Sequence, residues 1–183
     1  MPDAALAHPP RWLTAAQLHP APCAGVRDWL FDQGSLTRRL TALSQGTFAV
    51  EPLVQGWQVL RADECTALDV PAGSQGWVRE VYLRGYGDAW VFARSVAARS
   101  ALEGSGLALG ELGSRSLGEL LFSDRAFVRG PIEVTRYPAA WLPAEVRAER
   151  LWGRRSCFRR GELGVLVAEV FLPALWHKAE LDA

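Results

Sequence analysis

One apolar run near the C-terminus constrains the fold more than any other segment: Val165-Leu166-Val167-Ala168-Glu169-Val170-Phe171-Leu172. Read as a β-strand, it presents apolar side chains on both faces, because alternate residues point to opposite sides. A strand of this kind is typical of the centre of a sheet. The one charge in the run is Glu169, and burying an unpaired carboxylate costs several kcal/mol. We therefore expect Glu169 to be paired, protonated or held by a ligand.

The remaining periodicity predicts more strands than helices. We expect strands at residues 48–60, 77–83, 89–96, 132–136, 152–159 and 165–172. A glycine-containing connection at 84–88 suits an antiparallel hairpin, and a turn at 160–162 joins the last two strands. Helices are expected at 26–31, from a Ser35 cap through Leu43, and within 99–122, where Ser116 caps the second of two. Residues 63–74 are expected to form a polar loop.

These predicted helices fall between groups of strands and do not alternate with them one for one. We therefore predict an α+β fold with an antiparallel sheet and helices packed on one side. A chain of 183 residues is large enough to bury a core as a single domain over 1–183. Residues 1–25 are rich in alanine and proline, and we expect them to form an extended N-terminal arm.

Composition disfavours several classes of partner. Lysine plus arginine equals aspartate plus glutamate at 20 each, so no net charge attracts nucleic acid or anionic lipid. The longest apolar runs are far shorter than the roughly 20 residues that span a bilayer, and no secretion signal precedes residue 13. The three cysteines and the three histidines show no ligand spacing for a metal. We expect a soluble, cytoplasmic protein, monomeric by default.

Strand periodicity places two arginines on apolar faces. Arg79 shares a face with Trp77 and Val81, and Arg94 shares one with Phe92. One interpretation is an internal Arg–Glu ion pair that joins strands of the sheet. The other is a cavity in which Arg79 binds a ligand carboxylate while Glu169 addresses a polar group at the ligand's far end. The pattern alone leaves both open, together with the role of Arg94.

Two predicted helix starts could contribute to such a cavity. Leu36 follows Ser35 and Leu117 follows Ser116, so each leucine is the first helical residue. Main-chain N–H groups at this position lack helical partners and attract anionic oxygens. The alternative is that both are ordinary capped helices whose leucines belong to the core.

The chain resembles the chorismate pyruvate-lyase family over most of its length, and the order and spacing of six motifs carry this resemblance. They are Asp28-Trp29-Leu30, Ser35-Leu36-Thr37-Arg38-Arg39, Trp77-Val78-Arg79-Glu80, Leu112-Gly113 with Leu117-Gly118, Leu151-Trp152-Gly153-Arg154-Arg155-Ser156, and Glu169-Val170-Phe171-Leu172-Pro173. The resemblance implies a lyase that converts chorismate to 4-hydroxybenzoate and pyruvate, the first step of ubiquinone synthesis, without a cofactor. The role of Arg154 stays open.

The resemblance also assigns ligand contacts by position. The family's arginine falls on Arg79, its glutamate on Glu169, and its two remaining contacts on Leu36 and Leu117. Leu36 stands where the enterobacterial form has methionine, which leaves a main-chain contact unchanged but alters a side-chain contact. The resemblance further implies helical flaps over an internal ligand pocket. Whether Glu169 removes a proton or only holds a hydroxyl is left open.

Two other functions remain as alternatives. The same fold serves as the effector-binding domain of bacterial transcription regulators, although the first 75 residues contain no helix-turn-helix with a basic recognition helix. A lyase for a related enolpyruvyl compound is the second alternative.

Overall fold

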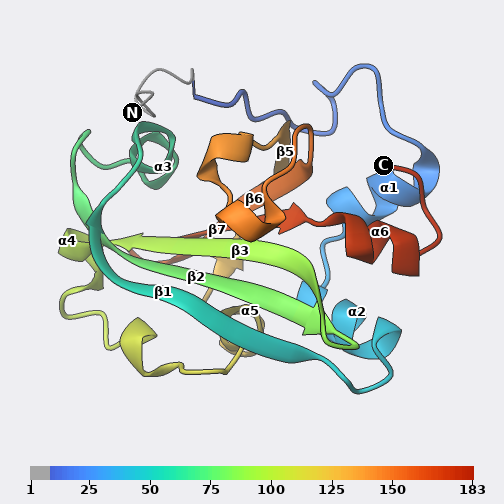
Figure 1. The fold of residues 1–183 in the computed structure, drawn as a ribbon. Helices are drawn as coiled ribbons and strands as arrows, with labels where there is room; N and C mark the ends of the chain where they lie inside the picture. Colours follow the sequence, from blue (N-terminus) through green and yellow to red (C-terminus); the bar gives the residue numbers. More distant parts are fainter. Residues whose placement is uncertain (1–8) are drawn as a thin grey trace.

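A seven-stranded antiparallel sheet forms the body of the molecule, in a computed structural model that describes residues 9–183 (Figure 1). The strands are β1 (Ala49–Val59), β2 (Gln75–Gly85), β3 (Asp88–Ala98), β4 (Val128–Arg129), β5 (Glu133–Arg136), β6 (Trp152–Arg160) and β7 (Leu163–Phe171). Their order is β1-β2-β3-β7-β6-β4, and β5 also pairs with β6. The apolar run thus lies in β7, between β3 and β6, and the prediction of a central strand is confirmed.

Within residues 9–183, six short α-helices and three 3-10 turns accompany the strands. The helices are α1 (Ala24–Leu30), α2 (Leu36–Leu43), α3 (Ala62–Leu68), α4 (Arg99–Leu102), α5 (Leu117–Ser123) and α6 (Pro173–Lys178), and the turns are η2 (Leu109–Glu111), η3 (Ala139–Trp141) and η4 (Ala144–Val146). Both predicted serine caps are confirmed. The Ser35 Oγ accepts from the main-chain N–H of Arg38 at 3.3 Å, and the Ser116 Oγ accepts from that of Glu119 at 3.2 Å.

The hairpin between β2 and β3 is tighter than the five-residue connection that the sequence predicts. The strands extend to Gly85 and Asp88, which pair with each other, so only Tyr86 and Gly87 form the turn. Both turn residues have positive φ, 52° and 84°, as a two-residue hairpin of the twist-compatible type requires. The short turn fixes the register as far as Arg84 and Ala89, and an irregularity between Leu83 and Arg84 then shifts the pairing of the two strands.

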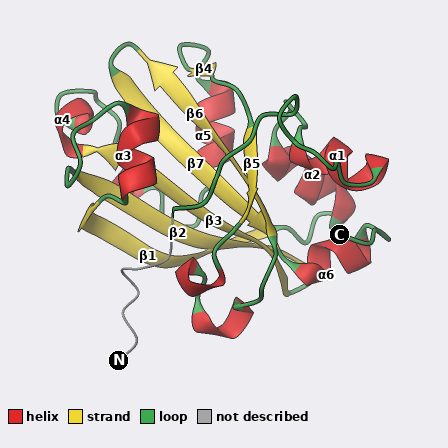
Figure 2. Ribbon diagram, turned by 90° about the horizontal axis from the view of Figure 1, so that it is seen from above, coloured by secondary structure: helices red, strands yellow, loops and turns green. Residues whose placement is uncertain are grey.

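The α+β class is confirmed, but the helices cover both faces of the sheet and not one side. Leu36 of α2 and Leu117 of α5 pack on the face that carries Val81 and Val167. On the other face, α3 packs against Val78, Val96 and Leu166 (Figure 1). Seen from above in Figure 2, α3 lies over the strands at one end of the sheet, while α1, α2 and α6 gather at the other. Two layers of apolar side chains therefore enclose the sheet.

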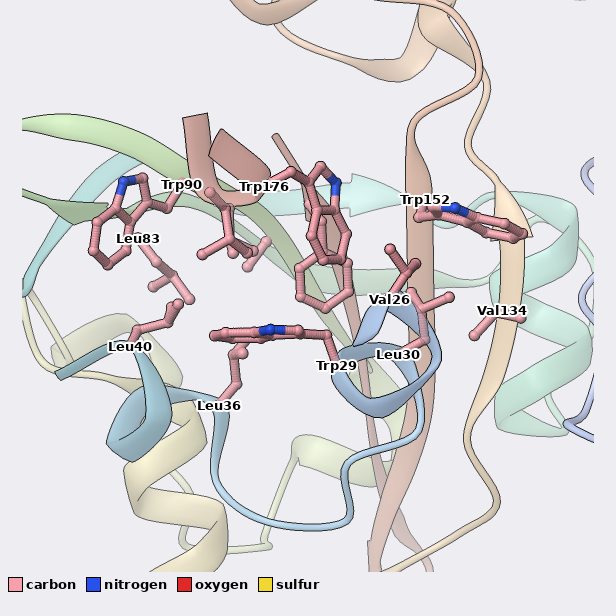
Figure 3. Packing of buried hydrophobic residues seen from close by; sticks show 14 of the residues in the cluster. Val26, Trp29, Leu30, Leu36, Leu40, Leu83, Trp90, Val134, Trp152 and Trp176 are labelled. Atoms are coloured by element: carbon pink, nitrogen blue, oxygen red, sulfur yellow. The ribbon is translucent and has the colours of Figure 1, made fainter. Parts of the chain in front are cut away.

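Aromatic packing fixes the start of α2 on the sheet. The Trp29 ring of α1 lies between Leu36 and Trp176 (Figure 3), with its centroid 6.4 Å from that of Trp176 in an edge-to-face arrangement. Leu36 and Leu40 are buried in the same cluster. Full burial of one such leucine contributes about 1.5–3 kcal/mol, so this end of α2 is held by its side chains as well as by its cap.

The prediction of a polar loop over residues 63–74 is wrong, because α3 occupies its first half. Cys65 and Leu68 are buried against the sheet at helical spacing. The N-terminus has no serine, threonine, asparagine or aspartate cap; the Glu64 carboxylate instead accepts from the main-chain N–H of Arg61 at 2.8 Å. A seven-residue helix without a standard cap leaves little periodic signal. Strand β4 and helix α6 were also not predicted.

The described part of the predicted N-terminal arm is docked on the body. Leu13 exchanges two main-chain hydrogen bonds of 2.8 Å with Val134 of β5, and the Trp12 indole donates to the Asp63 carboxylate at 3.1 Å. Residues 1–8, with His8, lie outside the described residues. Within residues 9–183, no helix combines the length and apolarity needed to cross a membrane.

Candidate functional site

Arg79 lies on β2 with its guanidinium enclosed, and only 2% of the residue is exposed. The guanidinium donates to the main-chain carbonyls of Gly113 at 2.7 Å and Arg115 at 2.9 Å, and to the Gln55 side chain at 3.2 Å. None of these acceptors is a carboxylate. Burial lowers the pKa of Arg79 from its ordinary value. The residue is therefore a buried cation that is hydrogen-bonded but not neutralised.

Glu169 lies on β7 directly opposite Arg154 of β6. The Arg154 Nε donates to the Glu169 Oε2 at 2.7 Å, and the two side chains are 2% and 14% exposed. Arg154 also donates to the carbonyls of Trp29 and Asp32, each at 3.1 Å. A guanidinium–carboxylate hydrogen bond of this length is charge-assisted and holds the orientation of the carboxylate. Among the described residues no hydrogen bond reaches the Glu169 Oε1, which is left for another donor.

The sequence left two interpretations of Arg79 and Glu169 open, an internal ion pair and a ligand cavity, and each is partly correct. Arg79 and Glu169 do not pair with each other, and both line one small cavity of about 30 Å³ with Leu117. The predicted Arg–Glu pairing exists, but its members are Glu169 with Arg154 and, elsewhere, Arg94 with Glu64. The structure therefore brings a guanidinium and a carboxylate to the same cavity.

Aliphatic side chains form much of the wall of this cavity, and the hydroxyl-bearing residues Thr37, Ser95 and Ser116 complete it. Val81, Leu83, Ala93 and Val167 rise from the sheet, and Leu117 closes it from above. Leu36 does not line this cavity; it lines an adjoining one of about 10 Å³ that Glu169 shares. Leu36 and Leu117 are both buried. The structure thus places the four predicted contact residues around two neighbouring compartments with Glu169 between them.

The starts of α2 and α5, called the flaps from here on, meet over these compartments. The Thr37 Oγ1 and the Ser116 Oγ lie 2.7 Å apart in a hydrogen bond that we call the flap bridge. Beside it, a Cβ added to Gly118 would lie 3.4 Å from the Thr37 Oγ1, so the two flaps are in close contact. The predicted arrangement of helical flaps over an internal pocket matches this geometry.

Arg94 belongs to a different site. It lies under α3, where its guanidinium donates to Glu64 at 2.6 and 3.2 Å and to Glu80 at 2.8 Å. Burial alone would lower the pKa of Arg94, but the two carboxylates outweigh it, so the pKa lies above its ordinary value. Arg94 is a neutralised structural charge on the face opposite the cavities.

Sequence reasoning left the role of Arg154 open and missed Arg129. Arg154 shares a strand face with Trp152, Ser156 and Phe158, a pattern that could have marked it as it marked Arg79. Arg129 of β4 lines the smaller cavity with Glu169. Its strand is two residues long, too short for any periodic signal.

Comparison with known proteins gives one family. The sequence profile of the family described as chorismate lyase matches residues 6–181. A protein of Pseudomonas aeruginosa PAO1 named probable chorismate pyruvate-lyase is 74% identical over 168 residues, covering 92% of this chain and 94% of that protein. A protein of the same name from Pseudomonas putida KT2440 is 64% identical over 169 residues, covering 92% and 91%.

Solved structures with a similar fold include domains of PhnF. The C-terminal domain of PhnF has a TM-score of 0.55 at 17% identity, covering 72% of this chain and 87% of that one. The effector domain of PhnF from Mycobacterium smegmatis has a TM-score of 0.53 at 15% identity, covering 77% and 90%. At this identity the likeness concerns the fold alone.

Proposed function

The chain belongs to the chorismate lyase family, and on that premise we propose that it converts chorismate to 4-hydroxybenzoate and pyruvate. One observation carries the proposal: a buried guanidinium without a carboxylate partner and a partly buried carboxylate with one unoccupied oxygen line the same cavity. Chorismate presents a ring carboxylate and, para to it, a hydroxyl. The guanidinium of the cavity would bind the ring carboxylate, and the free carboxylate oxygen would accept a hydrogen bond from the hydroxyl.

The proposed reaction is an elimination that leaves an aromatic ring. The C4–H bond and the C3–O bond of the ring break, and their electrons complete the aromatic system and leave on the ether oxygen. The departing enolpyruvate gains a proton at its methylene carbon and becomes pyruvate. Aromatisation supplies much of the driving force, so orientation and exclusion of water are the main tasks of the protein. The proposal involves no cofactor.

In this proposal Arg79 binds the ring carboxylate with two donors, and Leu117 packs on the ring. Glu169 accepts a hydrogen bond from the C4 hydroxyl through Oε1, because Oε2 already holds Arg154. The same oxygen could remove the C4 proton as a general base, a role that requires hydrogen-bond reach of that proton. Leu36 bounds the neighbouring compartment in which the side chain on C3 would lie.

Closed flaps exclude water from the reacting ring. A cavity of about 30 Å³ holds about one water molecule, so chorismate enters only after the flaps separate. The flap bridge and the buried leucines must therefore break and re-form in each cycle. We propose that flap opening limits product release, and a burst of product before steady state would support this.

The test is direct. Purified protein is mixed with chorismate, and 4-hydroxybenzoate and pyruvate are followed in equal amounts. Glu169→Gln keeps the hydrogen-bonding shape but removes the charge, so the proposal that Glu169 takes the proton predicts a large loss of kcat. A near-normal kcat in this variant would restrict Glu169 to holding the hydroxyl. Absence of 4-hydroxybenzoate with the unaltered chain would overturn the proposed reaction.

The same assay distinguishes the other candidates. An effector-binding module would bind chorismate or 4-hydroxybenzoate and leave chorismate intact, and only fold likeness to an effector domain supports that function. A lyase for a related enolpyruvyl compound would release pyruvate from that compound and not from chorismate. A role in ubiquinone synthesis in the cytoplasm, as a monomer, is part of the proposal that follows from the family.

A further inference from the structure

Two arginines at the site have no carboxylate partner. Three arginines line the two compartments, and within residues 9–183 only Arg154 forms a salt bridge, to Glu169. Arg79 donates to two carbonyls and an amide. Arg129 donates to the Ser156 hydroxyl at 2.9 Å and the Gln33 carbonyl at 3.1 Å. The site therefore holds three guanidiniums against one carboxylate.

The environment of Arg129 makes its charge costly. The side chain is half-buried between the rings of Phe122 and Phe158, with its guanidinium carbon 5.5 and 5.3 Å from their centroids. Burial lowers the pKa of Arg129, and the nearby charge of Arg154 lowers it further, against the opposing effect of Glu169. A half-buried cation beside another cation is stabilised by any anion that enters the compartment.

The chemistry of the proposed substrate supplies such an anion. Chorismate has two carboxylates, one on the ring and one on the enolpyruvyl group at C3, next to the C4 hydroxyl. With the ring carboxylate on Arg79 and the hydroxyl on Glu169, the group at C3 must lie beside Glu169. The compartment beside Glu169 is the one that Arg129 lines.

From this juxtaposition we infer that Arg129 binds the enolpyruvyl carboxylate, in a subsite formed with Ser156 and the ring of Phe158. The inference rests on the proposed function and adds to it a second carboxylate-binding residue. Arg129 holds the leaving group while the C3–O bond breaks, and it then holds the pyruvate carboxylate. Arg79 and Arg129, the two guanidiniums without a carboxylate partner, would thus each bind one of the two carboxylates of the substrate.

One motion of the flaps opens both compartments. Thr37 and Gly118 line the larger and the smaller cavity alike. With volumes of about 30 and 10 Å³, neither cavity admits its part of the substrate until these residues move. The two subsites are therefore filled and emptied together.

The experiment compares two ligands that differ by the enolpyruvyl group. Chorismate has both carboxylates, and 4-hydroxybenzoate has only the one that Arg79 binds. Arg129→Gln should raise the KM for chorismate by about 10- to 100-fold, the usual effect of losing a charge-assisted hydrogen bond. The inhibition constant of 4-hydroxybenzoate should change less than about twofold. Arg129→Lys, which keeps the charge, should recover part of the loss.

A matched control separates charge from position. Arg159→Gln removes the same charge from β6, the strand that pairs with β4, but Arg159 is exposed and donates to the Ala67 carbonyl on the opposite face. It should leave both constants unchanged. An equal loss of affinity for both ligands in Arg129→Gln would indicate general damage to the site and overturn the subsite, as would an unchanged KM for chorismate.

Failure of the proposed reaction would be recognised separately. If the unaltered chain makes no 4-hydroxybenzoate, the proposed function fails, and calorimetric titration with intact chorismate then tests the subsite alone. Weaker chorismate binding in Arg129→Gln, with 4-hydroxybenzoate binding preserved, supports the subsite in that case. Equal chorismate binding by the variant and the unaltered chain overturns it.

Discussion

Replacing Arg154 by methionine tests the ion pair at the centre of the site. The change removes the donor to Glu169 and leaves a carboxylate that is only 14% exposed without its partner. It also removes the donor to the carbonyls of Trp29 and Asp32. Breaking a buried pair in this way costs about 3–5 kcal/mol of unfolding free energy. For a chain of this length, the midpoint of thermal unfolding should fall by about 6–20 °C.

A double-mutant cycle shows how much of this cost is charge. Glu169→Leu alone leaves Arg154 buried with only its two carbonyl acceptors, so it should also destabilise. In the double variant no charge remains unpaired, and most of the lost stability should return. The residual cost should be about 1–3 kcal/mol, because the two carbonyls still lack their donor. Urea titration of the four proteins gives these free energies.

Two results would refute this reasoning. If Arg154→Met costs less than about 1 kcal/mol, Glu169 must find another partner or solvent, and the pair does not hold it. If the double variant is no more stable than Arg154→Met, the damage comes from the lost carbonyl contacts and not from the stranded charge. Either outcome would also remove the reason for assigning Oε1 to the ligand.

Three further variants test other parts of the structure. Arg79→Ala should weaken 4-hydroxybenzoate binding by about 10- to 100-fold in a calorimetric titration, and unchanged affinity would contradict the carboxylate contact. Thr37→Val removes the flap bridge, so stopped-flow measurement should show product dissociating about 3- to 10-fold faster, while Thr66→Val on α3 should leave the rate unchanged. Burial alone would raise the pKa of Asp32, but hydrogen bonds from a main-chain N–H and a guanidinium outweigh it and hold the pKa below its ordinary value. Asp32 therefore stabilises the fold above pH about 4, and this contribution disappears as the pH falls through the lowered pKa. Asp32→Asn should be less stable than the unaltered protein at pH 7 and about equally stable near pH 2. An equal loss of stability at both pH values would contradict a lowered pKa for Asp32.

The parts of the fold that the sequence predicts are those with strong local signals. The apolar run around Glu169 fixes β7 as a central strand, and Ser35 and Ser116 start their helices as expected. Helix α3 has no such local signal, because its apolar positions are few and its N-terminus lacks a standard cap. Local pattern cannot show that it covers the second face of the sheet, because that face is set by packing.

The site divides in the same way. Strand periodicity places Arg79 and Glu169 on apolar faces, and the structure puts them in one cavity. Strand periodicity cannot predict their partners, because the pairing of Glu169 with Arg154 depends on which strands are neighbours and on their register. Strand periodicity cannot identify Arg129, because this residue belongs to a strand of only two residues. Residues that act through long-range contacts require the folded chain.

Neighbouring residues of β2 serve opposite faces, and this has a consequence for folding fidelity. Arg79 points to the ligand cavity, while Glu80 binds Arg94 beneath α3. A slip of β2 by one residue would exchange the two faces. A slip in one direction would put Glu80 in the place of Arg79, in the cavity that Glu169 lines; a slip in the other direction would put Arg79 in the place of Glu80, beside Arg94. The first slip would bring two carboxylates to one cavity and take Glu80 away from Arg94, and the second would place two guanidiniums together. Either misaligned sheet is therefore penalised electrostatically, so the two charges of β2 also favour its correct alignment.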